Sequence, residues 1–154
     1  MNIVIEGCDG TGKTTIAKFL AETFGLYYWH ESAPRSFSEY CTMLNSGGVV
    51  FDRFCLGQFV YNKAEERKLG EEELKCLLNT VFKDTNTIMI YVDCATEIII
   101  NRLIERGEAT DNDRAALTKW VKNIRGTYKS LLNRNADNYI TIRGDESKCR
   151  LSII

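Results

Sequence analysis

The chain has 154 residues, of which 44% are hydrophobic and 27% charged, with a formal net charge of −1. This size and composition predict one soluble globular domain over residues 1–154, with enough apolar side chains to form a core. The nearly neutral charge balance argues against a partner that is a nucleic acid or an anionic membrane surface.

Cysteine and histidine usage argues against a zinc site. His30 is the only histidine, and no two cysteines have C-x-x-C spacing. The six cysteines, which we expect to be reduced and mostly buried, are Cys8, Cys41, Cys55, Cys76, Cys94 and Cys149. The first apolar run begins almost at Met1, leaving no room for a signal peptide, and no run approaches the roughly twenty residues of a membrane span. The expected location is the cytoplasm, without membrane partners.

A glycine-rich stretch lies between the first expected strand, at 2–6, and the first expected helix. It reads Gly7-Cys8-Asp9-Gly10-Thr11-Gly12-Lys13-Thr14-Thr15. A strand, such a turn and a helix are the context of a Walker A loop, in which backbone N–H groups and the helix dipole bind phosphates. Lys13 is expected to reach the β- and γ-phosphates of ATP, and the Thr14 hydroxyl to ligate Mg²⁺. The residues expected to bind ATP here are Gly7, Gly10, Gly12, Lys13, Thr14 and Thr15.

Short apolar runs and helical patterns alternate along the rest of the chain. The first helix carries Ile16, Phe19, Leu20 and Phe24 at helical spacing and ends at Gly25. After it we expect a buried strand at 26–30, a helix at 36–44, a strand at 49–52, helices at 54–68 and 71–83, a strand at 87–93, a helix at 96–106, a polar stretch at 107–113, a long amphipathic helix with an apolar stripe over 117–132, and a strand at 139–143. This order predicts an α/β protein, a three-layer P-loop kinase fold with a five-stranded parallel sheet and the ligand at the carboxyl ends of the strands.

The loop contains an acid, Asp9, which is unusual beside a polyanion. The stretch from Glu6 to Thr15 resembles the thymidylate kinase family, the P-loop kinases of nucleoside monophosphates. In that family the loop acid is turned toward the sugar hydroxyl of the nucleotide that accepts the phosphate, so the resemblance places Asp9 in the acceptor site. Alternatively, Asp9 only hydrogen-bonds within its own turn.

The triplet Asp52-Arg53-Phe54 follows the third expected strand. An acid in this place is a candidate carboxylate of the Mg²⁺ site, and an arginine can fork onto a phosphate. In the resembling family the same triplet holds the acceptor monophosphate through its arginine, which implies catalytic and acceptor-binding roles for Arg53, with Phe54 beside it. Tyr61-Asn62 stands where that family has an aromatic-Gln pair in the acceptor pocket. The alternatives are an ion pair between Arg53 and Asp52, and a core position for Tyr61.

Arginines bracket the polar stretch after the fourth expected strand. By resemblance, residues 106–114 form a lid over the donor phosphates, with Arg106 and Arg114 as catalytic cations. Residues 108–112 separate Arg106-Gly107 from Asp113-Arg114, five residues where the family pattern Arg-Gly-x-x-Asp-Arg has two, so the sequence leaves open which arginine reaches the γ-phosphate. The resemblance further places Arg102 and Arg143 at the adenine of ATP. Arg125 matches an Arg-x-x-Tyr of the family, with a solvated helix face as the alternative.

Glu31 ends the second expected strand, at the Arg-Glu-Pro of thymidylate kinases, of which only the acid is kept. Deoxynucleoside kinases also place a glutamate there, as the general base for a 5′-hydroxyl. The segment from Glu31 to Asp52 is much shorter than in thymidylate kinases, so the base pocket departs from the family. Candidates for stacking on a base are Trp29, Phe37 and Tyr40.

The first expectation is therefore transfer of phosphate from MgATP to a deoxynucleoside monophosphate, with dTMP converted to dTDP. The alternative is a deoxynucleoside kinase, or a kinase of a modified deoxynucleotide, with Glu31 as general base. A third class, a non-kinase NTPase, has weaker support. Residues 62–65 read Asn-Lys-Ala-Glu, which lacks both the Asp of a GTPase Asn-Lys-x-Asp motif and the buried strand expected before it, and 93–94 are not an acid pair. The expected partners are small nucleotides, and the resemblance implies a homodimer.

Overall fold

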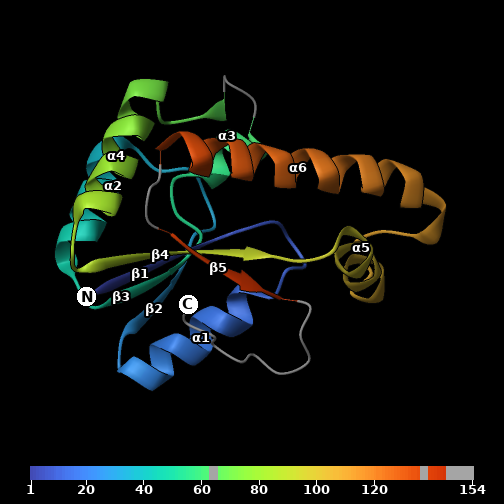
Figure 1. Cartoon of the computed structure of the whole chain (residues 1–154), viewed down its shortest axis with the longest axis horizontal. Coiled ribbons are helices and arrows are strands. Elements are labelled where there is room, and N and C mark those ends of the chain that lie inside the picture. The colour runs from blue at the N-terminus through green and yellow to red at the C-terminus, as the bar shows by residue number, and fades with distance from the viewer. Residues whose placement is uncertain (63–65, 136–138, 145–154) are drawn as a thin grey trace.

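The computed structural model describes residues 1–62, 66–135 and 139–144 (Figure 1). Its centre is a sheet of five parallel strands in the order β2-β3-β1-β4-β5. The strands are β1 (Asn2–Glu6), β2 (Tyr27–His30), β3 (Val49–Asp52), β4 (Thr87–Asp93) and β5 (Ile140–Arg143). The predicted fold class and sheet are confirmed. All five strands have their carboxyl ends at the same edge of the sheet, which is where ligands bind in this architecture.

Helices cover both faces of the sheet. They are α1 (Lys13–Phe24), α2 (Phe37–Ser46), α3 (Gly57–Tyr61), α4 (Glu71–Lys83), α5 (Thr96–Glu105) and α6 (Arg114–Asn135), with a 3₁₀ turn, η2, at Asp111–Asp113. Figure 1 shows α1 on one face and α2, α4 and α6 on the other. Within the described residues, no helix is both long and apolar enough to cross a membrane.

Half of the apolar stripe on α1 faces the core, because Leu20 is buried and Ile16 packs against the same cluster. Phe19 and Phe24 are 55% and 54% exposed, whereas Ala17 and Ala21 are buried together with Leu20 against β1, β3 and β4. Small alanine side chains let the helix approach the sheet closely, and this rotates the two phenylalanines toward solvent. Size complementarity therefore outweighs hydrophobicity on this helix.

The larger core lies on the opposite face, between the sheet and helices α2, α4, α5 and α6. The stripe on α6 is largely confirmed, because Val121, Ile124, Tyr128 and Leu132 are buried, while Trp120 stays 38% exposed. Cys8, Cys55 and Cys94 are buried as expected, and Cys76 is exposed. Cys149 and residues 63–65 lie outside the described part of the chain.

Two other expectations are corrected. The strand expected to be buried at 26–30 is an edge strand, so Tyr27 is 66% exposed. Of the helix expected over 54–68, the described residues contain one α-helix, α3, which is five residues long, and the backbone of Asn62 after it is extended. Residues 54–56 instead form a turn whose amides are bound by a buried carboxylate from β1. This turn brings the end of β3 next to the glycine-rich loop.

Candidate functional site

The glycine-rich loop, residues 7–15, connects β1 to α1 at the carboxyl edge of the sheet. A Cβ on Gly7 would lie 2.3 Å from the carbonyl oxygen of Val92, so only glycine lets the loop pass this close to β4. Gly12 has φ 94°, a left-handed conformation that turns the chain into the first residue of α1. The loop amides and the amino terminus of a 12-residue helix therefore lie together, as phosphate binding requires.

Lys13 is buried at the base of this loop. Its ammonium donates to the carbonyl oxygen of Cys8 at 2.7 Å and lies 3.9 Å from Oδ1 of Asp9. Burial lowers the pKa of Lys13, while the nearby carboxylate of Asp52 opposes that change. The cation is thus held inside the loop by groups that a phosphate oxygen can replace.

Asp52 ends β3 and its side chain is fully buried. One carboxylate oxygen, Oδ2, accepts from Thr14 Oγ1 at 2.6 Å and from Tyr28 and His30 at 3.0 Å each. The other oxygen, Oδ1, has no hydrogen-bond partner among the described residues. Partial burial and the bond to Asp52 raise the pKa of Tyr28 to about 12, so its hydroxyl remains a donor at neutral pH.

These groups fit Mg²⁺. An unpartnered carboxylate oxygen beside a threonine hydroxyl offers the hard oxygen ligands that the ion prefers. The described residues contain no cluster of three or more metal-binding side chains. A divalent ion held by Asp52 and Thr14 would therefore complete its shell with phosphate oxygens and water, as Mg²⁺ usually does.

Arg53 has a left-handed backbone, with φ 73°. Its amide donates to the carbonyl oxygen of Ile5 at 2.9 Å, and its guanidinium pairs with Asp9 and lies 5.3 Å from the centre of the Tyr61 ring. The Asp9 amide in turn donates to the Tyr61 hydroxyl at 3.1 Å. The alternative ion pair with Asp52 is wrong, because the carboxylate that Arg53 binds is Asp9. Three predicted acceptor residues are thus brought together.

Sequence reasoning missed Glu6, the last residue of β1. Its fully buried carboxylate accepts from the amides of Phe54 and Leu56 at 3.0 and 3.1 Å and from the Tyr128 hydroxyl at 3.3 Å. Burial raises the pKa of Glu6 to about 7, although those amides and the cations of Arg53 and Lys13 lower it. The carboxylate fixes the turn after Arg53. An acid in an otherwise apolar strand was the available signal.

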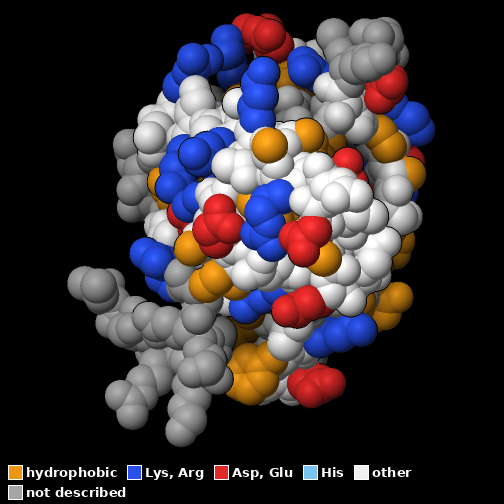
Figure 2. All heavy atoms as spheres, turned by 90° about the vertical axis from the view of Figure 1, so that its right-hand side faces the viewer, with side chains coloured by type: hydrophobic (Ala, Val, Ile, Leu, Met, Phe, Trp, Pro, Cys, Tyr) orange, Lys and Arg blue, Asp and Glu red, His pale blue; other side chains and the backbone are white. Residues whose placement is uncertain are grey.

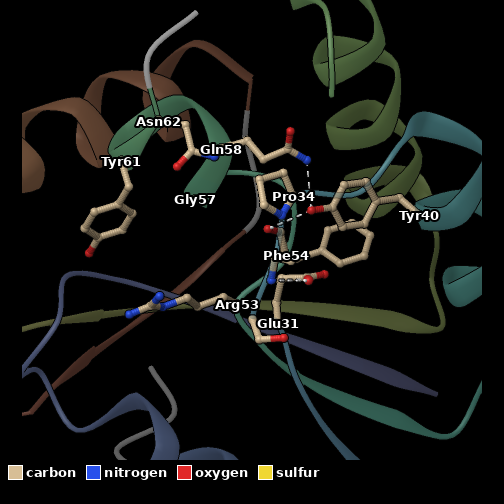
Figure 3. Close-up of a pocket in the computed structure, with 11 residues that line it drawn as sticks. Glu31, Pro34, Tyr40, Arg53, Phe54, Gly57, Gln58, Tyr61 and Asn62 are labelled. Atoms are coloured by element: carbon tan, nitrogen blue, oxygen red, sulfur yellow. Dashed lines mark hydrogen bonds between the residues drawn. The ribbon is translucent and has the colours of Figure 1, made fainter. Parts of the chain in front are cut away.

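A cavity of about 110 Å³, the Glu31 cavity, lies beside Arg53 (Figure 3). The residues around it are Glu31, Ser32, Ala33, Pro34, Tyr40, Arg53, Phe54, Gly57, Gln58, Tyr61 and Asn62. Burial raises the pKa of Glu31, whose carboxylate accepts from Arg35 Nε at 3.1 Å and from the Ala33 amide at 3.3 Å. The cavity therefore joins a carboxylate and a guanidinium in one small space.

Two of the three stacking candidates lie elsewhere. Tyr40 lines the Glu31 cavity, but its ring is buried edge-on against Phe54, with centroids 4.6 Å apart. Trp29 and Phe37 pack against the main core, and the guanidinium of Arg35 lies 5.1 Å from the Trp29 ring. Helix α2 closes this side of the cavity in Figure 3, where Tyr40 projects from it. Protein side chains therefore fill the space beside the shortened segment between Glu31 and Asp52.

A second cavity, the Gly144 cavity, has about 550 Å³ and lies on the other side of the loop. Gly10, Gly12, Thr15, Arg102, Arg106 and Gly144 are among its lining residues. Arg102 donates to the carbonyl oxygens of Gly10 at 3.0 Å and Gly144 at 2.8 Å. Its guanidinium thus ties the glycine-rich loop to the end of β5. Arg143, the other residue expected near adenine, ends β5 opposite Asp93.

The two proposed lid arginines differ in position. Arg106 follows α5 and lines both the Gly144 cavity and a third, the Lys13 cavity of about 390 Å³, which also contains Thr14, His30, Asp52 and Arg53. Arg114 instead binds Glu97, Asn101 and Asp111, and no described cavity beside the loop contains it. Figure 2 shows acidic and basic side chains interspersed over this end of the molecule. The structure therefore brings Arg106 to the loop but not Arg114.

Arg125 forms an internal ion pair, so the alternative of a solvated face is wrong for it. Its guanidinium binds Asp93 through two hydrogen bonds, of 2.7 and 3.0 Å, and Lys129 adds a third contact at 2.9 Å. Burial opposes ionisation, but hydrogen bonds from Arg125 and Lys129 lower the pKa of Asp93 to about 2. This pair attaches α6 to the end of β4, near the glycine-rich loop.

Solved structures share the fold at low sequence identity. The YorR protein of Bacillus subtilis, in complex with phosphorylated GDP, aligns over 95% of this chain and 87% of its own, with a TM-score of 0.79 and 18% identity. Deoxyadenosine kinase of M. mycoides with bound dATP aligns over 96% and 93%, with a TM-score of 0.62 and 16% identity. Shikimate kinase of Acinetobacter baumannii has a TM-score of 0.59 and 15% identity over 90% and 82% of the two chains.

Sequence comparison identifies the family, which the likeness in fold does not. A curated relative, the probable thymidylate kinase of Methanocaldococcus jannaschii, is 36% identical over 76 residues, which are 49% of this chain and 40% of that protein. The match therefore spans less than half of the relative's length. The family model of thymidylate kinase matches residues 35–151, which is most of the chain. Together with the loop and the Asp52-Arg53-Phe54 turn, this match shows that the chain belongs to the thymidylate kinase family.

Proposed function

We propose that the protein transfers the γ-phosphoryl group of ATP to a deoxynucleoside monophosphate, with dTMP as the first candidate, in a Mg²⁺-dependent reaction. The observation that carries the proposal is the Lys13 cavity, where the glycine-rich loop, Asp52, Arg53 and Arg106 converge. The Gly144 cavity on one side is the proposed donor site, and the Glu31 cavity on the other is the proposed acceptor site.

The proposed roles follow from the charge of the reactants. A monophosphate oxygen is already an anion, so the reaction needs alignment and cations more than a base. Lys13 would leave the Cys8 carbonyl for the β- and γ-phosphates, and Arg53 would exchange Asp9 for the acceptor phosphate. Bound at Thr14 and Asp52, Mg²⁺ would neutralise charge on the phosphates. Arg106, the lid arginine that lines the Lys13 cavity, would meet the transferred group.

A deoxynucleoside kinase is the second candidate, and one observation favours it. Glu31 lines the acceptor cavity, and burial raises its pKa, as suits a general base. Its carboxylate already accepts from Arg35 and the Ala33 amide, so accepting a hydroxyl proton would require a change in these contacts. A monophosphate acceptor needs no such change, which makes it the better-supported candidate.

An acceptor assay distinguishes the candidates. The protein, Mg²⁺ and [γ-³²P]ATP are incubated with dTMP, with each other deoxynucleoside monophosphate, or with thymidine, and the products are separated by thin-layer chromatography. We expect label in a nucleoside diphosphate and none in a nucleoside monophosphate. Labelled dTMP from thymidine alone would reject the first proposal in favour of the second. Label found only in inorganic phosphate would indicate an NTPase.

Two variants test the assigned residues within this assay. Lys13→Ala should abolish turnover. Arg53→Ala should lower kcat/KM for the acceptor by about 10- to 100-fold, the value of one or two charge-assisted hydrogen bonds, and leave the affinity for ATP unchanged. Arg134→Ala, at an exposed position in the last turn of α6, is the control. A loss of ATP affinity in Arg53→Ala would assign this arginine to the donor side.

A further inference from the structure

We infer that Tyr28 and His30 are positioning residues of the magnesium site, which hold one oxygen of Asp52 so that the other is directed to the ion. The inference rests on the proposed function, because it assumes that the site takes a metal–nucleotide complex. Neither side chain belongs to the glycine-rich loop or to the Asp52-Arg53-Phe54 triplet.

The register of the sheet creates this arrangement. β2 pairs with β3 so that His30 lies opposite Asp52 and Tyr28 opposite Val50. Residues two apart on a strand point to the same face, so both side chains flank the Asp52 carboxylate from the edge strand. The phenol and the imidazole Nδ1 each reach Oδ2 at 3.0 Å, and Thr14 approaches the same oxygen from α1 at 2.6 Å.

The distribution of these contacts over the two oxygens is strongly unequal. Three donors converge on Oδ2, whereas Oδ1 is buried and has no partner in the described part of the chain. An ionised carboxylate only accepts hydrogen bonds, so the phenol donates and His30 carries a hydrogen on Nδ1. A buried anionic oxygen without a partner is costly, and a cation or its bound water would satisfy it. Oδ1 is therefore the metal-facing oxygen.

The chemical nature of the two donors matters as well. The resemblance places an arginine of the family at the position of His30. In this chain the hydrogen bonds of a phenol and an imidazole orient the Asp52 carboxylate instead. Partners that orient a ligand in this way commonly contribute 10- to 100-fold to metal affinity.

The test measures metal-dependent nucleotide binding, not turnover. Calorimetry gives the affinity for the non-hydrolysable analogue AMPPNP with Mn²⁺ and with EDTA, and the ratio of the two is the gain due to the metal. Tyr28→Phe and His30→Ala should each reduce this gain by about 10-fold and leave the affinity in EDTA unchanged. His30→Asn should recover part of the gain, because its amide can donate in place of Nδ1–H. Tyr27→Phe, on the same strand but exposed, should match the wild type.

The outcomes separate the inference from the function on which it rests. A wild-type gain in both Tyr28→Phe and His30→Ala would overturn the inference, as would an equal loss of affinity with and without the metal. Should Tyr28→Phe fail to fold, the half-exposed His30 decides through its Ala and Asn variants. Failure of the wild-type protein to bind AMPPNP would instead overturn the proposed function, and this inference with it.

Discussion

Replacing Glu6 by glutamine tests how a buried carboxyl group supports the site. The substitution keeps an oxygen that can accept from the amides of Phe54 and Leu56, and it removes the ionisable group. The pKa of Glu6 is raised from 4.5 to about 7, mainly by burial. Folding therefore favours the protonated form, and wild-type stability should fall as the pH rises through the interval from 4.5 to 7.

The size of the effect follows from this difference in pKa. Each pKa unit corresponds to about 1.4 kcal/mol, so complete ionisation of Glu6 costs about 3 kcal/mol of folding free energy. Part of this free energy is already lost at pH 5, because Glu6 in the unfolded chain has a pKa near 4.5. Between pH 5 and pH 8, Glu6→Gln should therefore gain about 2–3 kcal/mol relative to the wild type.

Urea unfolding at pH 5 and pH 8, followed by circular dichroism, measures this gain. Glu22→Gln, which removes one charge from an exposed position on α1, is the matched control and should run parallel to the wild type. An equal change in the free energy of unfolding between pH 5 and pH 8 for Glu6→Gln and the wild type would refute the reasoning. It would mean that Glu6 has the same pKa in the folded and unfolded chains. A stability gain for the variant that is larger at pH 5 would also contradict the sign.

Three further substitutions have defined outcomes. Arg125→Met should lower the free energy of unfolding, measured in urea at pH 7, by about 1–2 kcal/mol, a value kept small by the water that reaches the ion pair. This loss should shrink as the pH falls toward 2, because Asp93 becomes protonated. An equal loss at pH 7 and at low pH would contradict the prediction. Gly144→Ala places a Cβ 2.0 Å from the Thr11 carbonyl oxygen and should weaken AMPPNP binding about 10-fold by calorimetry. Gly126→Ala, with open space around its Cβ in the interior of α6, should raise stability by about 0.5–1 kcal/mol and leave AMPPNP binding unchanged.

The order of the helices and strands could be predicted from the sequence, but the burial of each element and of its side chains could not. Periodicity identified α1 and β2 correctly as a helix and a strand. It did not show that Ala17 is buried while Phe19 is exposed, because hydrophobicity alone does not show how closely a helix approaches a sheet. It also took β2 for a buried strand, since the position of a strand in the sheet depends on pairing with distant segments.

In the site as well, contiguous motifs could be recognised from the sequence, whereas long-range contacts could not. The loop and Arg53 were predicted from contiguous motifs. The role of Glu6 depends on Phe54 and Tyr128, which lie 48 and 122 positions further along the chain. Arg114 was assigned by resemblance, although neighbours brought by α5 bind it in this structure. Tertiary contacts of this kind are not encoded in a motif.

The left-handed backbone of Arg53 has an evolutionary consequence. A side chain in this conformation costs on the order of 1 kcal/mol, which glycine would avoid. Glycine would also delete the guanidinium proposed to hold the acceptor. A screen that rewards thermal resistance alone would therefore enrich glycine mutants at this codon, whereas a screen for transfer to the acceptor should retain the more strained arginine.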